Sequence, residues 1–313
     1  MQSQDLSVLE LLGSSIAKMG QIPEHIAVIM DGNRRYARTM GMKTLLGHQT
    51  GANVLHNLES WGKALGCKEL TVYAFSTENF KRTKEEVENL MDLMFYELGK
   101  SLLNVEDGSN MDTCIQFIGN LHTLPAKVQH RMANIMKKTR YFEPYKLNIA
   151  VAYTGREGIL RSMNVIQRNT DNNQINTCLV DQSQHLMDVR PVDMLIRTGG
   201  DLRLSDFMLW ESSHAYIHFT PVTWPELTFW QLLHACFMYQ IHRKKVTPKE
   251  LPPNNYLDLT DVQYADLTLE KSRTLEWKVI DGKAGSDFPH GRNAKIPSPT
   301  IWYRQLLKNV LTI

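Results

Sequence analysis

From residue 26 onward, short apolar runs alternate with longer stretches of helical periodicity, and this alternation constrains the fold more than any other feature of the chain. Strands that alternate with helices are typical of βαβ units, which build a parallel sheet flanked by helices. The pattern predicts strands at Ile26–Met30, Leu70–Phe75, Cys114–Ile118, Leu147–Tyr153, Met194–Ile196 and Tyr216–Phe219. It predicts helices at Thr50–Leu65, Lys84–Leu103, Pro125–Thr139, Glu157–Arg168 and Glu226–Gln240. We therefore expect one α/β domain with an open, mostly parallel six-stranded sheet flanked by helices.

The two ends of the chain differ from this central pattern. Before Pro23, apolar residues recur at spacings of three and four and predict an amphipathic helix: Leu6, Leu9, Leu12, Ile16 and Met19. Its apolar face either packs on the protein's own core or contacts a membrane or a substrate chain. After residue 245 the sequence becomes polar and loses its periodicity. We expect an N-terminal helix over 1–22, the α/β domain over 23–245, and a C-terminal tail or appendage over 246–313.

The charge balance argues against one broad class of partner. Lys and Arg total 35 and Asp and Glu total 33, so the formal net charge is +2 at pH 7. Nonspecific binding to nucleic acid is driven by a strongly basic field, which this chain lacks. We expect no nucleic-acid partner, and any binding of anions must come from local clusters of charge.

Cysteine spacing and hydropathy predict the cellular environment. Cys67, Cys114, Cys178 and Cys236 lie tens of residues apart without a C-x-x-C pair, which favours buried reduced thiols over a zinc site or a disulfide framework. The first residues lack the basic and apolar regions of a secretory signal, and no uncharged apolar run approaches about 18 residues. The sequence predicts neither secretion by that route nor a membrane span.

Polar residues follow the first predicted strand where it ends, in Asp31-Gly32-Asn33-Arg34-Arg35. Ligands of open α/β sheets bind outside the carboxyl ends of the strands. The glycine lets the backbone approach a ligand, and the free N–H groups of the following helix favour a phosphate. A carboxylate beside phosphate is explained by Mg²⁺ between them. From this segment alone, Asp31 as a simple helix N-cap is an equal alternative.

The second strand and the region after the first also carry polar groups. Ser76, Asn79 and Arg82 place a hydroxyl, an amide and a guanidinium in one turn, although ordinary capping explains that turn by itself. His48 follows Gly47 and is able to donate to a phosphate or assist proton transfer, whereas a lone histidine is more often structural. Only its position near the Asp31 turn favours a functional role.

The end of the fifth strand gives the strongest signal. Arg197 and Arg203 flank a glycine pair and Ser205 follows them, so the segment offers planar bidentate donors, backbone N–H groups and a hydroxyl. Such donors suit a diphosphate, with surface salt bridges as the alternative. The chain lacks G-x-x-x-x-G-K-[ST], G-x-G-x-x-G, H-E-x-x-H and G-x-S-x-G, which disfavours NTPases, dinucleotide-binding enzymes, zincins and α/β-hydrolases. An Asp-Asp pair is also missing, so the chain contains no aspartate-rich metal motif.

Four segments together resemble a known family. They are His25–Tyr36, Val72–Arg82, Leu195–Trp210 and Trp224-Pro-Glu226, and they are similar in sequence and order to the motifs of the cis-prenyltransferases, the undecaprenyl diphosphate synthase-like enzymes. The resemblance spans roughly residues 20–242 and is closest to eukaryotic members that form dolichol precursors. It implies the cis-prenyltransferase fold and repeated addition of isopentenyl diphosphate to a farnesyl-type allylic diphosphate, giving a long-chain polyprenyl diphosphate for dolichol synthesis and protein glycosylation.

The resemblance also implies the roles of individual residues. Asp31 would bind Mg²⁺ and help to ionise the allylic diphosphate, which would be surrounded by Gly32, Asn33, Arg34, Arg35, Arg38 and His48. Isopentenyl diphosphate would be held by Arg197, Arg203 and Ser205. The reacting centre, where orientation and proton removal are assisted, would be lined by Ser76, Asn79 and Arg82. The implied catalytic set is therefore Asp31, Asn33, Ser76, Asn79 and Arg82, with Mg²⁺ as the cofactor.

Two positions depart from the pattern of bacterial members. Those members carry an arginine where this chain has Thr44, with Lys43 adjacent, and a metal-binding glutamate where it has Tyr216. Asp31 then needs a second carboxylate, for which Asp201 is the candidate. Eukaryotic two-component members share the second loss, and a Nogo-B-receptor-like partner completes their site with an Arg-x-Gly tail. Residues 309–313 of this chain contain no such tail, so we expect a heteromer with such a subunit, with a homodimer as the alternative.

Three hypotheses follow for the chain as a whole. The first is a Mg²⁺-dependent cis-prenyltransferase attached peripherally to the cytosolic face of the endoplasmic reticulum membrane. The second is a non-catalytic scaffolding subunit of the same fold, and the third is an unrelated α/β enzyme that binds phosphate. A scaffold is expected to have eroded strand-end motifs, whereas Asp31, Asn33, Arg197, Arg203 and Ser205 are all present. The first hypothesis is therefore favoured.

Overall fold

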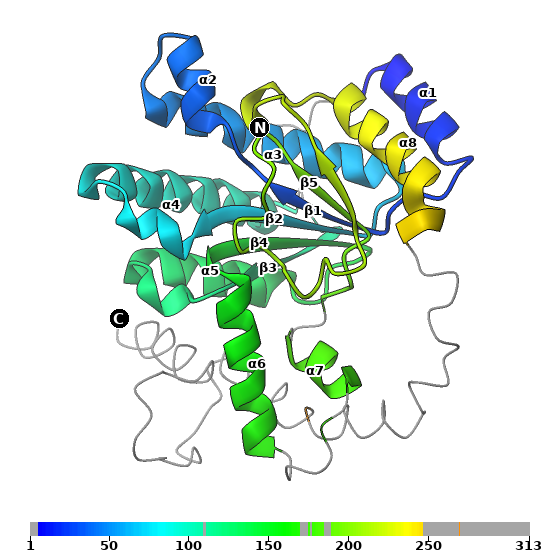
Figure 1. Cartoon of the computed structure of the whole chain (residues 1–313). Helices are drawn as coiled ribbons and strands as arrows, with labels where there is room; N and C mark the ends of the chain where they lie inside the picture. The colour runs from blue at the N-terminus through cyan, green and yellow to red at the C-terminus, as the bar shows by residue number, and fades with distance from the viewer. Residues whose placement is uncertain are drawn as a thin grey trace.

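A computed structural model describes residues 6–108, 111–169, 175, 177–184, 189–246 and 269. Within these residues, six parallel strands form one sheet in the order β3-β4-β2-β1-β5-β6 (Figure 1). Their bounds are β1 His25–Ile29, β2 Glu69–Ser76, β3 Thr113–Ile118, β4 Tyr145–Tyr153, β5 Met194–Arg197 and β6 Tyr216–Phe219. This sheet confirms the predicted fold class. The apolar runs predicted the strands because strands that are buried on both faces consist almost entirely of apolar residues.

Helices cover the faces of this sheet (Figure 1). They are α1 Val8–Ala17, α2 Asn33–Thr39, α3 Thr44–Leu65, α4 Lys84–Glu106, α5 Ala126–Thr139, α6 Gly155–Asn169, α7 Thr177–Gln184 and α8 Phe229–Val246. Short 3₁₀ turns lie at η1 Thr77–Lys81, η2 Leu121–Thr123 and η3 Trp224–Glu226. The sequence pattern missed α7, and it indicated a helix after Gly32 without giving bounds, where α2 forms. Helix α2 has little apolar periodicity, and of its residues only Ala37 is buried.

The predicted start of the last helix, at Glu226, is wrong. Trp224, Pro225 and Glu226 form the 3₁₀ turn η3, and α8 begins at Phe229. Apolar periodicity continues across this boundary, which explains why the pattern alone did not separate the turn from the helix. The buried Trp224 side chain fixes the turn, since its indole N–H donates to the Gly51 carbonyl at 2.8 Å.

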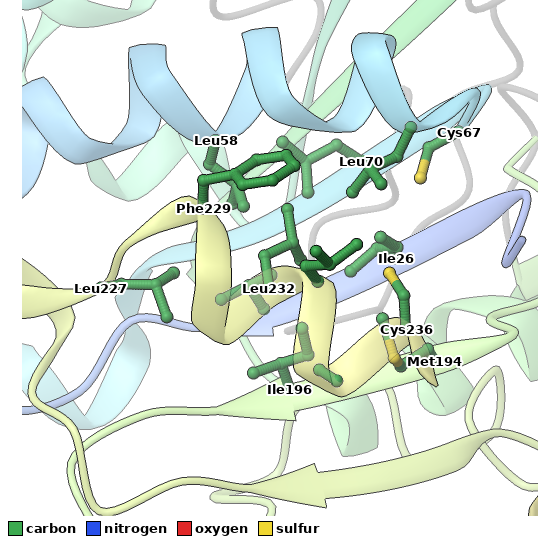
Figure 2. Packing of buried hydrophobic residues seen from close by; sticks show 14 of the residues in the cluster. Ile26, Leu58, Cys67, Leu70, Met194, Ile196, Leu227, Phe229, Leu232 and Cys236 are labelled. Carbon is green, nitrogen blue, oxygen red and sulfur yellow. The ribbon is translucent and has the colours of Figure 1, made fainter. Parts of the chain in front are cut away.

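The core on one face of the sheet lies between the central strands and α3 and α8. Figure 2 shows Phe229 and Leu232 of α8 in the same cluster as Leu58 of α3 and Leu70 of β2. The Cys236 thiol lies in this cluster, and burial raises its pKa to about 12. A thiol with so high a pKa stays protonated at neutral pH, which fits the predicted structural role of the cysteines. On the same face, α4 and α5 enclose a second apolar cluster against β2, β3 and β4, and Ile149 packs against both clusters. The opposite face carries a third cluster, which includes Tyr73 of β2.

Helix α1 packs with its small residues, not with its large ones. It lies alongside α8 (Figure 1), where a Cβ on Gly13 would meet Leu233 at 3.1 Å, and Ala17 is fully buried. Of the predicted apolar face, Leu6 packs against the core, but Leu9, Leu12 and Ile16 are 64%, 57% and 50% exposed. The alternative that this face packs on the protein's own core is therefore wrong for these three side chains. None of the described helices is long and apolar enough to cross a membrane.

The predicted tail over 246–313 lies outside the described residues except for Val246 and Leu269. Leu269 is fully buried and clusters with Val165 and Ile166 of α6 and Leu179 of α7. This one position therefore ties the C-terminal region to the α6–α7 pair.

Candidate active site

The carboxyl ends of β1, β2 and β5 bring the predicted residues to one edge of the sheet. In the register of the strands, Ile29 of β1 pairs with Tyr73 of β2 and with Arg197 of β5. Asp31 follows β1, and Ser76 ends β2, so the polar segments that follow these three adjacent strands meet. This is the position at which open α/β sheets bind their ligands.

Asp31 is held by its backbone from two sides. Its N–H donates to the Thr198 hydroxyl at 3.0 Å, and its carbonyl accepts from the Thr198 hydroxyl and the Trp224 N–H, both at 2.8 Å. The next residue, Gly32, has φ +105°, and a Cβ there would meet Thr223 at 2.7 Å, so only glycine fits the turn. The carboxylate is fixed before any ligand binds.

The Asp31 carboxylate does not cap a helix. The N-cap of α2 is Gly32, which has no side chain to donate or accept. Instead, one Asp31 oxygen accepts from the Gly32 N–H at 2.7 Å and the other from Arg197 Nη2 at 2.7 Å. The alternative of a simple N-cap is therefore wrong, and the carboxylate belongs to an ion pair at the strand ends.

The charge state of Asp31 follows from this pair. Burial raises the pKa of the carboxyl, but the hydrogen bonds from Arg197 and Gly32 and the positive charges of Arg197 and Arg35 outweigh burial and bring the pKa below its usual value. Asp31 is therefore a carboxylate at neutral pH, as a ligand for a cation must be.

Arg197 organises the site from inside the protein. Its side chain is only 3% exposed. Nη1 donates to Ser205 Oγ at 2.6 Å and to the Arg203 carbonyl at 2.5 Å, and Nη2 reaches Asp31 at 2.7 Å and Asp201 at 3.4 Å. Arg203, in contrast, is 65% exposed, and its Nη2 lies 2.8 Å from Asp201. Arg197 is therefore restricted to contacts inside the protein, whereas the exposed Arg203 side chain is accessible to a ligand.

Three buried polar atoms at this edge have no hydrogen-bond partner: Asn33 Oδ1, His48 Nε2 and Arg197 Nε. Buried polar groups are nearly always paired, so a group of orphans indicates a missing polar ligand or water. Asn33 Oδ1 lies close to Gly51 of α3, where any Cβ would overlap it. Thr198 and Trp224 lie inside two of the segments on which the family resemblance rests, although no role was predicted for either. Gly51 lies outside those segments, and only the fold brings it into the site.

His48 lies near the start of α3, within electrostatic reach of Arg82 and Arg34. Burial, and then the positive charges of Arg82 and Arg34, lower its pKa to about 4 although Glu86 opposes the shift. The imidazole is therefore neutral at pH 7. This is the form that donates one hydrogen bond and accepts another.

The lowered pKa of His48 predicts a pH dependence of stability. Between its folded pKa of about 4 and the unfolded value of about 6.5, the unfolded chain binds a proton that the folded chain does not. Stability should fall as the pH drops through this window, by up to about 3 kcal/mol from this residue. Urea unfolding at a series of pH values should give a flatter profile for His48→Gln than for the wild type. The exposed control His214→Gln should keep the wild-type slope; equal slopes in all three proteins would contradict the prediction.

Ser76 and Asn79 stabilise the turn that carries them. They form a capping box at η1, in which the Ser76 N–H donates to Asn79 Oδ1 at 2.9 Å. The capping alternative is therefore realised, and it holds both side chains at the end of β2. Arg82 pairs with Glu86 at 2.8 Å. Burial and the positive charge of Arg34 lower the Arg82 pKa, whereas Glu86 and Asp31 oppose the shift, so the turn lies within electrostatic reach of the Asp31 site.

The remaining predicted residues lie around this centre. Arg34, Arg35 and Arg38 are exposed on α2, and Arg35 Nη2 would lie 3.1 Å from a Cβ on Gly199. Lys43 is an exposed N-cap residue of α3 that makes no side-chain capping bond.

Tyr216 lies elsewhere. It pairs with Met194 at the beginning of β5, the end of the strand opposite Arg197, and its ring stacks on His242. A carboxylate contribution at this position is excluded by the residue type itself.

The donor set fits a Mg²⁺ ion that shares its coordination with substrate. Among the residues that the structure describes, no group of three or more His, Cys, Asp or Glu side chains forms a metal site. Asp31 and Asp201 both contact the same nitrogen of Arg197, at 2.7 and 3.4 Å. Mg²⁺ commonly takes one or two protein carboxylates and completes its shell with phosphate oxygens and waters. One half-buried carboxylate next to a phosphate-binding edge meets that requirement.

Comparisons with known proteins match most of the chain. A family model described as putative undecaprenyl diphosphate synthase matches residues 29–247. The chain is 40% identical to human dehydrodolichyl diphosphate synthase complex subunit DHDDS over 76% of this chain and 73% of that protein. It is 37% identical to an isoprenyl transferase of Thermotoga maritima, over 72% and 97%. Lavandulyl diphosphate synthase from Lavandula x intermedia, crystallised with dimethylallyl diphosphate, superposes with a TM-score of 0.67 at 30% identity, over 70% and 95%.

Proposed function

The chain belongs to the undecaprenyl diphosphate synthase-like family, the cis-prenyltransferases, and from this membership we propose that it condenses isopentenyl diphosphate repeatedly onto a farnesyl-type allylic diphosphate. The product is a long-chain polyprenyl diphosphate of the dehydrodolichyl type, for dolichol synthesis and protein glycosylation. The observation that carries the proposal is the strand-end site in which Asp31, Arg197 and Ser205 form one hydrogen-bonded chain beside three orphaned polar atoms.

Two diphosphates have separate places at this edge. The allylic diphosphate lies on the β1 side, against the arginines of α2, Asn33 and His48. Isopentenyl diphosphate lies on the β5 side, where Arg203 is exposed and Ser205 presents its hydroxyl. Arg197 lies beneath both places. Holding two reactants in one geometry replaces a bimolecular encounter with an effectively unimolecular step.

The reaction breaks the allylic C1–O bond and forms a bond from C4 of isopentenyl diphosphate to C1, after which a proton leaves the new chain. The cationic groups of α2 stabilise the charge that grows on the departing diphosphate. Ser76, Asn79 and Arg82 line the reacting centre at the η1 turn, for orientation and proton removal. The capping box holds Ser76 and Asn79 in place, and the ion pair with Glu86 holds Arg82.

Asp31 is the residue that would hold Mg²⁺, with Asp201 as the nearest additional carboxylate. When bound, the ion would neutralise diphosphate charge and favour ionisation of the allylic substrate. The role of this chain's own residues is to keep the carboxylate ionised, which the Arg197 pair does by lowering the pKa of Asp31.

A non-catalytic scaffolding subunit is the alternative, and the site disfavours it. A scaffold has no need of an ionised half-buried carboxylate, a buried arginine that joins two loops, and unpaired polar atoms between them. Buried polar atoms without partners lower stability unless a ligand or water compensates them.

A partner subunit and a membrane location complete the proposal. The human relative is described as a complex subunit, and Tyr216 leaves Asp31 without the glutamate that bacterial members carry. We infer a heteromer with a Nogo-B-receptor-like subunit, a homodimer being the alternative. The exposed apolar side chains of α1 support peripheral attachment to the cytosolic face of the endoplasmic reticulum, which co-flotation with lipid vesicles tests.

The deciding experiment measures incorporation of labelled isopentenyl diphosphate into farnesyl diphosphate with Mg²⁺, with and without the co-expressed partner. We expect long products that require Mg²⁺ and increase at least about tenfold with the partner, because an incomplete site loses transition-state stabilisation. Chelation by EDTA should abolish them. Abundant long products from the chain alone would overturn the partner requirement, and no incorporation under any condition would overturn the function.

A further inference from the structure

Helix α6 begins on a cap that another segment supplies. Asp206, 50 residues later in the chain, accepts the Gly155 N–H with its carbonyl at 2.6 Å and the Arg156 N–H with Oδ1 at 3.1 Å. The other carboxylate oxygen accepts from Arg156 Nε at 2.8 Å. The first N–H groups of a helix have no partner within it, and an anionic acceptor there is favoured by the helix dipole. Asp206 and Arg156 therefore clasp the start of α6 to the loop after β5.

This loop adopts a backbone conformation that needs external support. Ser205, Asp206 and Met208 have φ of +51°, +59° and +45°, a region that non-glycine residues enter rarely. Such conformations persist only where the surroundings over-determine them. Two contacts supply that support. Phe207 is fully buried and stacks on Tyr73 at 4.5 Å between ring centroids, and Asp206 binds the first residues of α6.

The contacts of Asp206 with α6 affect the preceding residue, Ser205. Ser205 Oγ accepts from Arg197 Nη1 at 2.6 Å, and Tyr73 Oη approaches the Ser205 carbonyl at 3.4 Å. Without the clasp, Ser205 and Asp206 are free to relax toward negative φ, which would turn the Ser205 hydroxyl away from Arg197. The orientation of a diphosphate-binding hydroxyl then depends on a carboxylate that itself points toward α6.

We propose that Asp206 and Arg156 are positioning residues that hold Ser205 in its binding orientation for isopentenyl diphosphate. The inference rests on the proposed function of the site. Neither residue contacts the Asp31 side, so the effect is specific to one of the two substrates. The Arg156 side chain is 77% exposed, so its ion pair with Asp206 contributes little to global stability. The hydrogen bond from the Arg156 backbone N–H to Asp206 Oδ1 therefore contributes more.

The test compares Asp206→Ala, Asp206→Asn and Arg156→Ala in the full chain, with its partner subunit where turnover needs it. Asp206→Ala should raise both KM and the calorimetric Kd for isopentenyl diphosphate by about 10- to 100-fold, because small displacements of binding groups have effects of that size. KM for farnesyl diphosphate should stay within about twofold. Asp206→Asn should recover most of the affinity, since asparagine keeps the acceptor and tolerates positive φ. Arg156→Ala should lose about threefold.

Ser7→Ala is the matched control. It removes the cap of α1, a helix that packs against α3 and α8, and should leave both KM values unchanged. Equal increases in both KM values for Asp206→Ala, or an unchanged Kd with only a lower melting temperature, would overturn the positioning role. If Asp206→Ala does not fold, wild-type affinity in Arg156→Ala together with no loss in Asp206→Gly would overturn it as well. A wild-type chain that neither binds isopentenyl diphosphate nor turns it over would instead reject the proposed function.

Discussion

Replacing Asp31 with asparagine should lower the rate of condensation by about 10³-fold, the size of loss that follows removal of one preorganised electrostatic group. The amide keeps an oxygen for the Gly32 N–H but carries no charge for Mg²⁺ and leaves the buried Arg197 without its closest counter-ion. The rate should be measured from incorporation of labelled isopentenyl diphosphate, and the fold should be checked by circular dichroism.

Asp201→Asn is the matched control for this substitution. It also neutralises a carboxylate beside Arg197, but at 3.4 Å instead of 2.7 Å. We expect a loss of about tenfold or less, because the longer contact contributes less. Activity of Asp31→Asn within a few-fold of the wild type would remove Asp31 from the mechanism, and an equal loss in both variants would mean that the two carboxylates act together.

Replacing Arg197 with alanine should damage stability and catalysis at once. Removing one partner of a buried ion pair typically costs about 3–5 kcal/mol, and here the change also frees Ser205 and the Arg203 carbonyl. We expect denaturant unfolding to show a loss of about that size and kcat/KM to fall by at least about 100-fold. Arg197→Lys should fold better but stay impaired, since one ammonium lacks the planar fork that reaches both sides.

Arg203→Ala should behave differently, although the sequence gives the two arginines the same role. The Arg203 side chain is exposed, so its loss should raise KM for isopentenyl diphosphate by about 10- to 100-fold, the equivalent of about 1.5–3 kcal/mol, at nearly unchanged stability. Matching profiles for the two alanine variants would contradict the internal role of Arg197.

The sheet and the place of the site follow from the sequence because both depend on short-range pattern. The predicted β6 strand has the observed bounds. Asp31 follows β1, and Ser76 and Arg197 are the last residues of β2 and β5. The turn at Gly32 indicated that a helix follows, but the bounds of α2 were not predicted because its exposed basic residues carry no periodic signal. The local pattern predicts where each strand ends, and in a parallel sheet the carboxyl ends of the strands lie at one edge. The pattern therefore predicts which residues reach the site.

Features that depend on tertiary contacts were not predictable in this way. Which face of α1 is buried depends on the close approach of α8 to Gly13, and the sequence gives the larger side chains the stronger signal. The inward direction of Arg197 and the clasp at Asp206 join residues far apart in the chain. The low pKa of His48 requires burial together with charges from other elements.

The burial of Leu269 changes how variants of this protein should be interpreted. A substitution beyond residue 246 falls in a polar, Pro-containing region and would ordinarily be classed as tolerated. Position 269 nevertheless has the environment of an interior residue, since it lies among Val165, Ile166 and Leu179. A polar replacement there, or a premature stop codon before it, uncovers apolar surface on α6, the helix whose first residues bind Asp206 of the loop after β5. Natural variation at this codon should therefore be restricted to apolar residues, unlike that of its sequence neighbourhood.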